Sequence, residues 1–439
     1  MKKSLVVAAL ALAQLSGCAS IDRNYLAQPV ETQIFVANKP GELRPFFKTL
    51  YEDGERNAVL NEDRLGLAAL ETGHFAIAAH ALDDAIARID AIYADNPQAE
   101  KARSNFHQEK VKDFKGETYE RAMTYDYRGL LYLRTGEYDN ARAAFLGASR
   151  QDTFSEDQNY NEDFGLMDYL AGWSSMCMGD QVSAGDHLRR AARVTPSLAP
   201  LAENPGKFLA IMETGYAPVK LREGKYQELL QFAGHPANQN SAAPLLQGDA
   251  AVGAPALAGD LYYQATTQGE RIVDVINADK AQFKNNAYTA AGVGDVMART
   301  GTMMMFSRNT KNSNNSNMQS AGMAVLAAGV LVNLISSGIA AATTPQADIR
   351  AWEGLPGQVY LQTLDSPPSD PGVLSMSVNS ASAPVPFAVT ARNGACGFVW
   401  AHFPVSKQLM PQTQIIPEDT DDRRGPENMA FRERLKTQF

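Results

Sequence analysis

The sequence predicts a mainly α-helical protein with an α+β C-terminal part. A helix–turn–helix pattern recurs three times before residue 205, and short alternating runs separated by Pro, Gly, Ser and Asn follow after it. Apolar residues three and four apart are typical of helices, whereas strict alternation is typical of strands. Two helical patterns at about 285–342, joined by the polar run KNSNNSN, predict a helical hairpin inserted into a small antiparallel β domain.

The 439 residues are enough for two or three domains. The predicted order is a signal peptide at 1–18, a tether at 19–45, a helical domain at 46–204, a β domain at 205–410 with the inserted hairpin, and a flexible tail at 411–439. The tether lacks helical periodicity and would space the folded body away from a membrane. The tail is charged and contains Pro and Gly.

The first 18 residues have the features of a secretory signal. Lys2 and Lys3 precede an apolar run at 5–15, which ends in Leu-Ser-Gly-Cys at Cys18. This run is too short to read as a membrane-spanning helix. Its ending resembles a bacterial lipobox, which implies that Cys18 carries lipid, including palmitate, and becomes the mature N-terminus. The alternative is an ordinary signal peptide with a chance cysteine.

The residue after Cys18 indicates in which membrane the protein is anchored. Ala19 stands where retention in the inner membrane usually calls for Asp. By resemblance to lipoprotein sorting, we expect the protein on the outer membrane, lipid-anchored and facing the periplasm. The formal net charge is −9, which argues against a nucleic-acid partner.

The clearest helical pattern runs through residues 129–148. Gly136 separates two apolar runs, and Ala141, Phe145 and Ala148 follow at spacings of three or four. A glycine suits a helix end that needs a positive φ. The same offsets recur around Gly73 upstream and around Gly179 downstream.

These offsets resemble the tetratricopeptide (TPR) repeat, which has glycine, aromatic, alanine and proline residues at such intervals. The matching positions are Gly73, Phe75 and Ala78, then Gly136, Tyr138, Ala141 and Phe145, then Gly179, Ala184 and Pro196. The units are farther apart than the roughly 34 residues of a TPR unit, so the array would carry insertions. The alternative is a generic helical domain with alanine-rich faces.

A wider resemblance rests on the lipobox, the repeats, the run GYAPVK at 215–220 and the run ADIRAWEGLP at 347–356. Together they resemble a family of poorly characterised bacterial TPR-containing outer-membrane lipoproteins. Trp352 and Pro356 are the most specific part of the match. The resemblance implies an accessory protein of envelope assembly or secretion, often linked by gene context to curli-pore-like lipoproteins. It brings no catalytic residues.

The second helix of the predicted hairpin, at 319–342, is uncharged and about as long as a membrane span. Its Gly, Ala and Ser residues would allow close helix packing. Asn333, Ser336 and Ser337 favour a buried or partner-packed helix, and membrane insertion is the alternative. Cys177 and Cys396 could form a disulfide in an oxidising compartment, but two buried free thiols are the favoured interpretation.

No pattern predicts catalysis, a metal or a cofactor. The histidines form neither an HExxH motif nor a Cys/His zinc spacing, and GxSxG and Walker patterns are missing. The acidic run at 153–163 lacks the glycine and closing glutamate of an EF-hand loop.

The predicted function is therefore a non-enzymatic scaffold for envelope proteins, with the concave face of the array offered to a partner. Homo-oligomerisation through the hairpin is a further expectation. The alternatives are a membrane-inserting component of a secretion or pore complex, through 319–342, and a peptidoglycan-linked enzyme activator.

Overall fold

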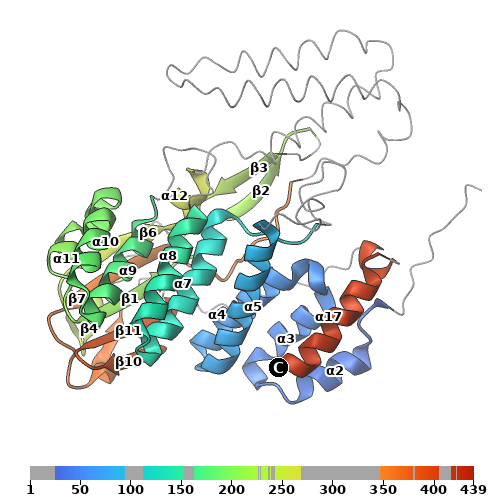
Figure 1. Ribbon diagram of the computed structural model, residues 1–439, viewed down its shortest axis with the longest axis horizontal. Coiled ribbons are helices and arrows are strands. Elements are labelled where there is room, and N and C mark those ends of the chain that lie inside the picture. Colours follow the sequence, from blue (N-terminus) through green and yellow to red (C-terminus); the bar gives the residue numbers. More distant parts are fainter. Residues whose placement is uncertain are drawn as a thin grey trace, which may run out of the picture. The chain divides into compact units, whose positions relative to one another are not determined.

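The computed structural model describes residues 25–93, 112–152, 163–225, 227, 229–235, 238, 243–267, 347–378, 381–404, 417–421 and 423–439 (Figure 1). They are mainly helical, with a mixed sheet region toward the C-terminus. The chain forms two compact units, residues 1–57 with 411–439 and residues 58–410. Among the described residues, no helix is long and apolar enough to cross a membrane. Cys18 and the predicted hairpin at 285–342 lie outside these residues.

The first unit joins the two ends of the chain. Its elements are α2 (Pro29–Ala37), η2 (Gly41–Leu43), α3 (Arg44–Asp53), η3 (Glu55–Asn57), η10 (Pro417–Thr420) and α17 (Gly425–Gln438). Its core is aromatic: the ring of Phe35 stacks on Tyr51 at 4.7 Å, and Phe47 meets Phe439 edge-on at 5.2 Å.

Polar contacts fix α17 to the N-terminal segment. Asn428 accepts a hydrogen bond of 2.9 Å from the backbone N–H of Glu55, and Arg432 donates to the carbonyls of Tyr51 and Tyr25. The predictions of a tether at 19–45 and a flexible tail at 411–439 are therefore wrong where the structure describes them. The composition of each segment alone could not predict this order, because each segment is stabilised by side chains of the other.

The second unit begins with three helical hairpins. They are α4 (Ala58–Glu71) with α5 (Phe75–Tyr93), α7 (Thr118–Thr135) with α8 (Tyr138–Asp152), and α9 (Gly165–Met178) with α10 (Gln181–Val194). Neighbouring hairpins touch through α5 with α7 and through α8 with α9. η5 (Pro196–Leu198) and α11 (Ala199–Glu203) follow. Each hairpin turns at a glycine with positive φ, as predicted: +78° at Gly73 and Gly136 and +89° at Gly179.

The three hairpins repeat one packing contact. Gly66, Gly129 and Gly172 on the first helices face Leu82, Phe145 and Leu188 on the second helices. A Cβ atom at each of these glycines would lie under 3.0 Å from the facing side chain. The alanines five and twelve residues after each turn glycine are all buried: Ala78 and Ala85, Ala141 and Ala148, Ala184 and Ala191. The sequence repeat therefore corresponds to a repeated contact between helices.

A five-stranded sheet lies behind the hairpins, in the order β10-β11-β1-β7-β6. Its strands are β1 (Phe208–Thr214), β6 (Ala256–Asp260), β7 (Gln358–Leu364), β10 (Val389–Asn393) and β11 (Cys396–Phe403). β1 runs parallel to β11, and the other pairs are antiparallel. The prediction of an antiparallel domain is wrong at this pair, because alternation along a strand carries no information on the direction of its neighbour.

The two faces of this sheet have different neighbours. On one face, Phe208, Ala210 and Met212 share a core with a second sheet of order β5-β4-β8-β9. Those strands are β4 (Leu245–Gln247), β5 (Ala250–Ala251), β8 (Leu374–Met376) and β9 (Val385–Pro386). On the other face, Glu213 and Trp400 meet Tyr127 of α7.

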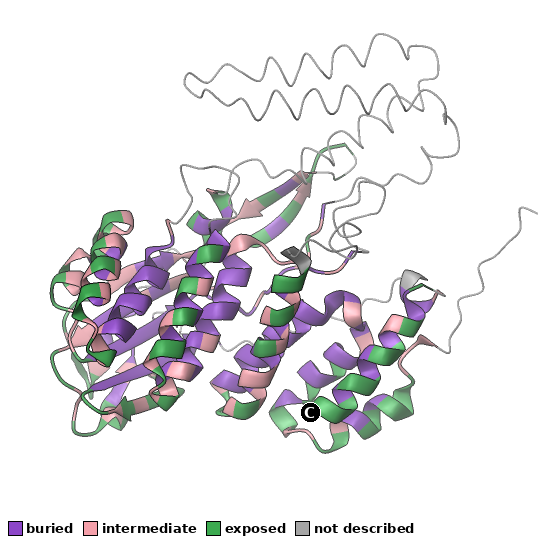
Figure 2. Ribbon diagram, in the orientation of Figure 1, coloured by how far each residue is buried: buried purple, intermediate pink, exposed green. Residues whose placement is uncertain are grey.

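The first helix of each hairpin is largely buried. Every residue of α4 except Glu71 is buried, and most residues of α7 and α9 are buried as well (Figure 2). α7 contacts β10, and α9 contacts β6. The side of α7 and α9 turned toward the sheet is therefore packed against this chain's own strands and is not open to another protein.

Two further elements differ from prediction. Alternating runs predicted strands after residue 205, but in that region α12 (Leu261–Thr266) is a helix, because Asp260 caps it by accepting a hydrogen bond from the N–H of Tyr263. Cys177 of α9 and Cys396 of β11 form a disulfide with their Cα atoms 6.0 Å apart, so the prediction of free thiols is wrong. The helix-facing side of β11 brings the two thiols together.

Candidate functional site

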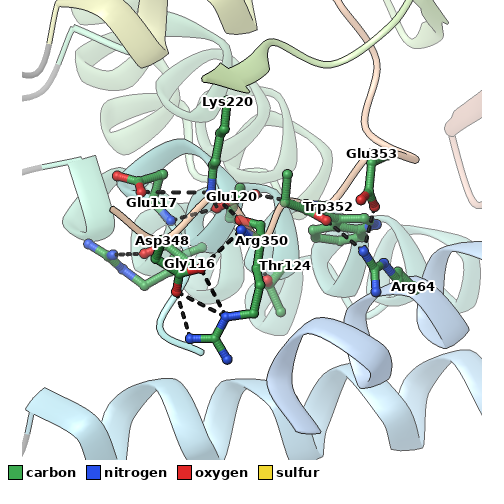
Figure 3. Close-up of polar contacts among 12 residues, drawn as sticks. Arg64, Gly116, Glu117, Glu120, Thr124, Lys220, Asp348, Arg350, Trp352 and Glu353 are labelled. Carbon is green, nitrogen blue, oxygen red and sulfur yellow. Dashed lines mark hydrogen bonds and ion pairs between the residues drawn. The ribbon is translucent and has the colours of Figure 1, made fainter. Parts of the chain in front are cut away.

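Lys220 is a buried lysine in the two-stranded sheet of β2 (Val219–Glu223) and β3 (Leu229–Ala233). Its side chain is 2% exposed, and its Nζ donates to Oε2 of Glu120 at 2.7 Å and to the carbonyl of Arg350 at 2.8 Å (Figure 3). Glu117 lies 3.7 Å from the same nitrogen. The lysine charge is therefore fully compensated inside the fold.

Glu120 is held equally tightly at the first turn of α7. Oε2 of Glu120 accepts from the backbone N–H of Glu117 at 2.7 Å, which completes a capping box. Oε1 accepts from the backbone N–H of Trp352 at 2.8 Å. A carboxylate is favourable at a helix N-terminus because unpaired N–H groups and the helix dipole point toward it.

The segment 347–356 lies across this helix end. Arg350 forms an ion pair with Asp348 at 2.6 Å and donates to the carbonyl of Lys112. Burial alone would raise the pKa of Asp348, but the adjacent Arg350 outweighs it and lowers that pKa. Arg64 of α4 donates to the carbonyl of Ala351 at 2.7 Å and pairs with Glu353 (Figure 3).

Trp352 completes the contact. It is 1% exposed, and its ring lies 5.6 Å from the ring of Tyr127 on α7. The runs GYAPVK and ADIRAWEGLP, both singled out in the sequence, thus converge on Glu120 through Lys220 and Trp352. We name Glu117, Glu120, Lys220, Arg350 and Trp352 the Glu120 cluster.

The β2–β3 hairpin, which carries Lys220 of the Glu120 cluster, has two further neighbours. The N–H of Ala347 donates to the carbonyl of Gln227 at 2.9 Å, and Arg222 donates to the carbonyl of Ala347. α12 packs against β3 and α7. Ala347 and α12 therefore both lie against this hairpin.

A second polar cluster lies between α4, α7 and the large sheet. Oε2 of Glu213 accepts from the hydroxyl of Tyr127 at 3.0 Å, and Nδ1 of His402 lies 2.9 Å from Oε1 of Glu71. Asp126 is 1% exposed and lies near Glu213. We name Glu71, Asp126, Tyr127, Glu213 and His402 the Glu213 cluster.

Burial dominates the acid–base behaviour of the Glu213 cluster. It raises the pKa of Glu213 to about 7, although the charge of His402 acts in the opposite direction. Burial and the charge of Glu213 raise the pKa of Asp126 well above its usual range. Burial would lower the pKa of His402, but the neighbouring carboxylates of Glu71 and Glu213 outweigh it and raise that pKa overall. Asp126 and Glu213 therefore hold their protons to a higher pH than exposed carboxyl groups do.

Both clusters connect helices to strands, and Glu120, Lys220 and Trp352 of the first and Asp126, Glu213 and His402 of the second are buried. The described residues contain no group of three His, Cys, Asp or Glu side chains that could hold a metal ion.

The described surface does contain a groove, formed between the first and second hairpins. Its volume is about 900 Å³. It is lined by residues 73–77 and 79 around the first turn and by Arg128, Leu131, Tyr132, Arg134, Thr135, Glu137 and Asn140 around the second. Two arginines lie flat on aromatic rings there: the guanidinium of Arg134 is 3.8 Å from the ring centre of Phe75, and that of Arg128 is 3.8 Å from that of Tyr132.

The positions predicted from the repeat fall into two groups. Gly73 and Phe75 line the groove. The others serve the fold: Gly136 and Gly179 make turns, Ala78, Ala141, Phe145 and Ala184 are buried, Tyr138 begins α8 with its hydroxyl bonded to the carbonyl of Asn393, and Pro196 begins η5.

The residues of both polar clusters were missed as site candidates. No signal in the sequence indicated Lys220, because alternation in the run VKL predicts Val219 and Leu221 inside and the lysine in water, the reverse of what is found. Nothing local pairs it with Glu120, which lies 100 residues earlier. The Glu213 cluster likewise combines residues from two helices and two strands.

No family model, curated protein or solved structure matches the chain.

Proposed function

We propose that this chain is a non-enzymatic, lipid-anchored scaffold of the outer membrane, which binds an envelope protein through the groove between its first two hairpins. The groove is the observation that carries the proposal, because the sides of α7 and α9 that face the sheet are packed against the chain's own strands. Cys18 supplies the anchor, and the disulfide of Cys177 with Cys396 fits an oxidising compartment such as the periplasm.

The repeated glycine contacts support a TPR-like array, in which three hairpins stack side by side. In this array the sheet covers the face that TPR proteins usually offer to a partner. The expected docking surface therefore moves from the concave face to the groove at the turn end of the hairpins.

The groove has the chemistry of a peptide site. Ile77 and Leu131 provide apolar contact area, and Arg134, which stacks on Phe75, has no acidic partner among the described residues. Arg128 already pairs with Asp83 at 2.7 Å. A peptide segment with an apolar side chain beside a carboxylate would fit these groups, since a stacked guanidinium keeps its N–H donors available.

Site-specific crosslinking in cells tests this function. A photoreactive residue at Asn140, which lines the groove, should crosslink one specific envelope protein, and Arg134→Glu should abolish that product. The matched control is a photoreactive residue at Arg189, which is 74% exposed on α10 outside the groove. The proposal fails if both positions give the same products, or if Arg134→Glu leaves the Asn140 product unchanged.

A second candidate is a membrane-inserting component acting through residues 319–342. One observation favours it: the run 319–342 is uncharged and about as long as a membrane span. Fractionation of Cys18→Ser separates the candidates. Release of this variant into the periplasm supports a lipid-only anchor, and its retention in the membrane supports insertion.

A further inference from the structure

α2 is a helix with apolar residues on opposite faces. Phe35 is 7% exposed and packs on Phe47 and Tyr51 inside the first unit. On the other side, Val30 is 66% exposed and Ile34 is 69% exposed, with Ala37 exposed one turn further along. Residues four and seven apart share one face of a helix, so these three side chains form an outward stripe. We name it the α2 stripe.

The α2 stripe needs a cover, because a helix that is apolar on both faces is normally buried on both. Val182 on α10 is more exposed, at 77%, but no second large apolar residue stands one turn away from it on the outside of that helix. A single exposed apolar side chain is ordinary, whereas a stripe on a helix indicates a binding surface.

The position of α2 in the chain points to a lipid surface. Tyr25 is fixed to the first unit, because its carbonyl accepts a hydrogen bond of 2.6 Å from Arg432. Only residues 19–24 separate it from Cys18. A fully extended chain spans at most about 3.6 Å per residue, so Tyr25 lies within roughly 25 Å of a lipidated Cys18. α2 begins four residues later and is held near the bilayer whatever path the link takes.

We infer that the α2 stripe lies on the bilayer surface, with Val30 and Ile34 entering the boundary between headgroups and acyl chains. This inference rests on the proposed lipid anchor at Cys18. The acyl chains supply the affinity, and the stripe fixes which side of the first unit faces the membrane. The segment at 19–45 is then a docked element and not a spacer.

The cysteines of this chain make a direct test available. Of the three, Cys18 carries the proposed lipid and the other two are joined in the disulfide, so Ile34→Cys introduces a single free thiol. The full-length lipidated variant is labelled there with a bimane fluorophore and reconstituted into phosphatidylethanolamine–phosphatidylglycerol vesicles. Half of the acyl chains carry bromine, which quenches bimane on contact. Val182→Cys, labelled in the same way, is the matched control.

We expect the brominated vesicles to remove most of the fluorescence at position 34 and none at position 182. Equal quenching at the two positions would overturn the inference. It would also fall if the label at position 34 is shielded from water in soluble Cys18→Ser protein without vesicles. In that case the other unit or a second copy of the chain covers the stripe.

Flotation of the vesicles separates this inference from the proposed anchor. If neither labelled protein floats with the vesicles and its N-terminal peptide has no lipid mass, the anchor itself is wrong. If both proteins float and position 34 is not quenched, the anchor stands and the docking of α2 is wrong.

Discussion

At the residue scale, the Glu213 cluster contains acidic groups and a histidine whose pKa values are raised in the folded protein. The carboxyl groups of buried Asp126 and Glu213, and that of Glu71, whose side chain is 5% exposed, share their surroundings with one histidine, His402. Their charges cannot all be present at once without a large desolvation cost. The stability of the second unit should therefore respond to pH in the range where Glu213 and His402 titrate.

The sign of that response follows from the pKa shifts. The pKa of Glu213 is raised from 4.5 to about 7, so between these values the folded state holds a proton that the unfolded chain releases. The pKa of His402 is raised above 6.5, so its contribution is complete below that value and is lost as the pH rises through the folded value. Both groups make the free energy of unfolding fall as the pH increases.

We predict that Glu213→Gln flattens this dependence. The variant should be more stable than the wild type at about pH 8, by on the order of 1–3 kcal/mol, because it has no proton to lose. Urea unfolding of both proteins from about pH 5 to pH 8 measures how the free energy of unfolding depends on pH in each. Groups with lowered pKa values, such as Asp348, act in both proteins and cancel in the difference. Parallel stability curves for the two proteins would contradict the prediction.

Removing one charge from the Glu120 cluster should lower the stability of the fold. Lys220→Met leaves the carboxylate of Glu120 buried without its cation, which costs about 3–5 kcal/mol in comparable pairs. Adding Glu120→Gln removes the uncompensated charge and should recover part of that loss. Arg189→Met, which breaks the exposed pair with Asp186, should change nothing measurable. A Lys220→Met variant as stable as the wild type would show that the pair is dispensable.

At the element scale, the hairpins depend on helix surfaces that approach closely. Gly172 on α9 has Cγ of Leu188 at 2.9 Å and the carbonyl oxygen of Ala184 at 3.2 Å from where a Cβ atom would lie. Gly185 on α10 has only the end of the Arg189 side chain nearby, at 3.1 Å. In this hairpin a Cβ atom at Gly172 would therefore meet the backbone of the facing helix, whereas a Cβ atom at Gly185 would meet only a flexible side chain.

We predict opposite effects for the same substitution at these glycines. Gly172→Ala should destabilise the protein by about 1–3 kcal/mol, because the backbone of α10 must move away. Gly185→Ala should stabilise it by up to about 1 kcal/mol, because alanine is the better helix former and Arg189 can move. Urea denaturation midpoints of the two variants measure this. Equal shifts would mean that the hairpin is not closely packed at Gly172.

The elements also show what the sequence could predict. Turn glycines and strand alternation are local signals, so the hairpin turns at Gly73, Gly136 and Gly179 and the presence of strands after residue 205 were predicted. Parallel pairing of β1 with β11, the cap of α12 and the disulfide depend on residues brought together from distant positions. The candidate site was predicted least well, because Lys220 meets Glu120 and Trp352 only after the sheet and the hairpins have packed.

At the scale of the whole molecule, the disulfide joins the helical layer to the sheet across 219 residues of chain. Closing so long a loop reduces the freedom of the unfolded chain, so removing both cysteines should cost roughly 2–5 kcal/mol. Cys177→Ser with Cys396→Ser tests this by thermal unfolding. Alkylation of protein isolated from cells should modify these cysteines only after reduction, and free thiols before reduction would contradict the bond.

The first unit has a consequence for the order of events during synthesis. Its N-terminal part, residues 25–57, shares its core with α17, and the last residue, Phe439, packs on Phe47. A ribosome releases the N-terminal part first and α17 last. Phe35, Phe47 and Tyr51 can pack on one another at that stage, but Phe47 lacks the ring of Phe439 until α17 has been synthesised. Residues 58–410 lie between the two parts of the first unit, so its core is completed only after the second unit has been synthesised.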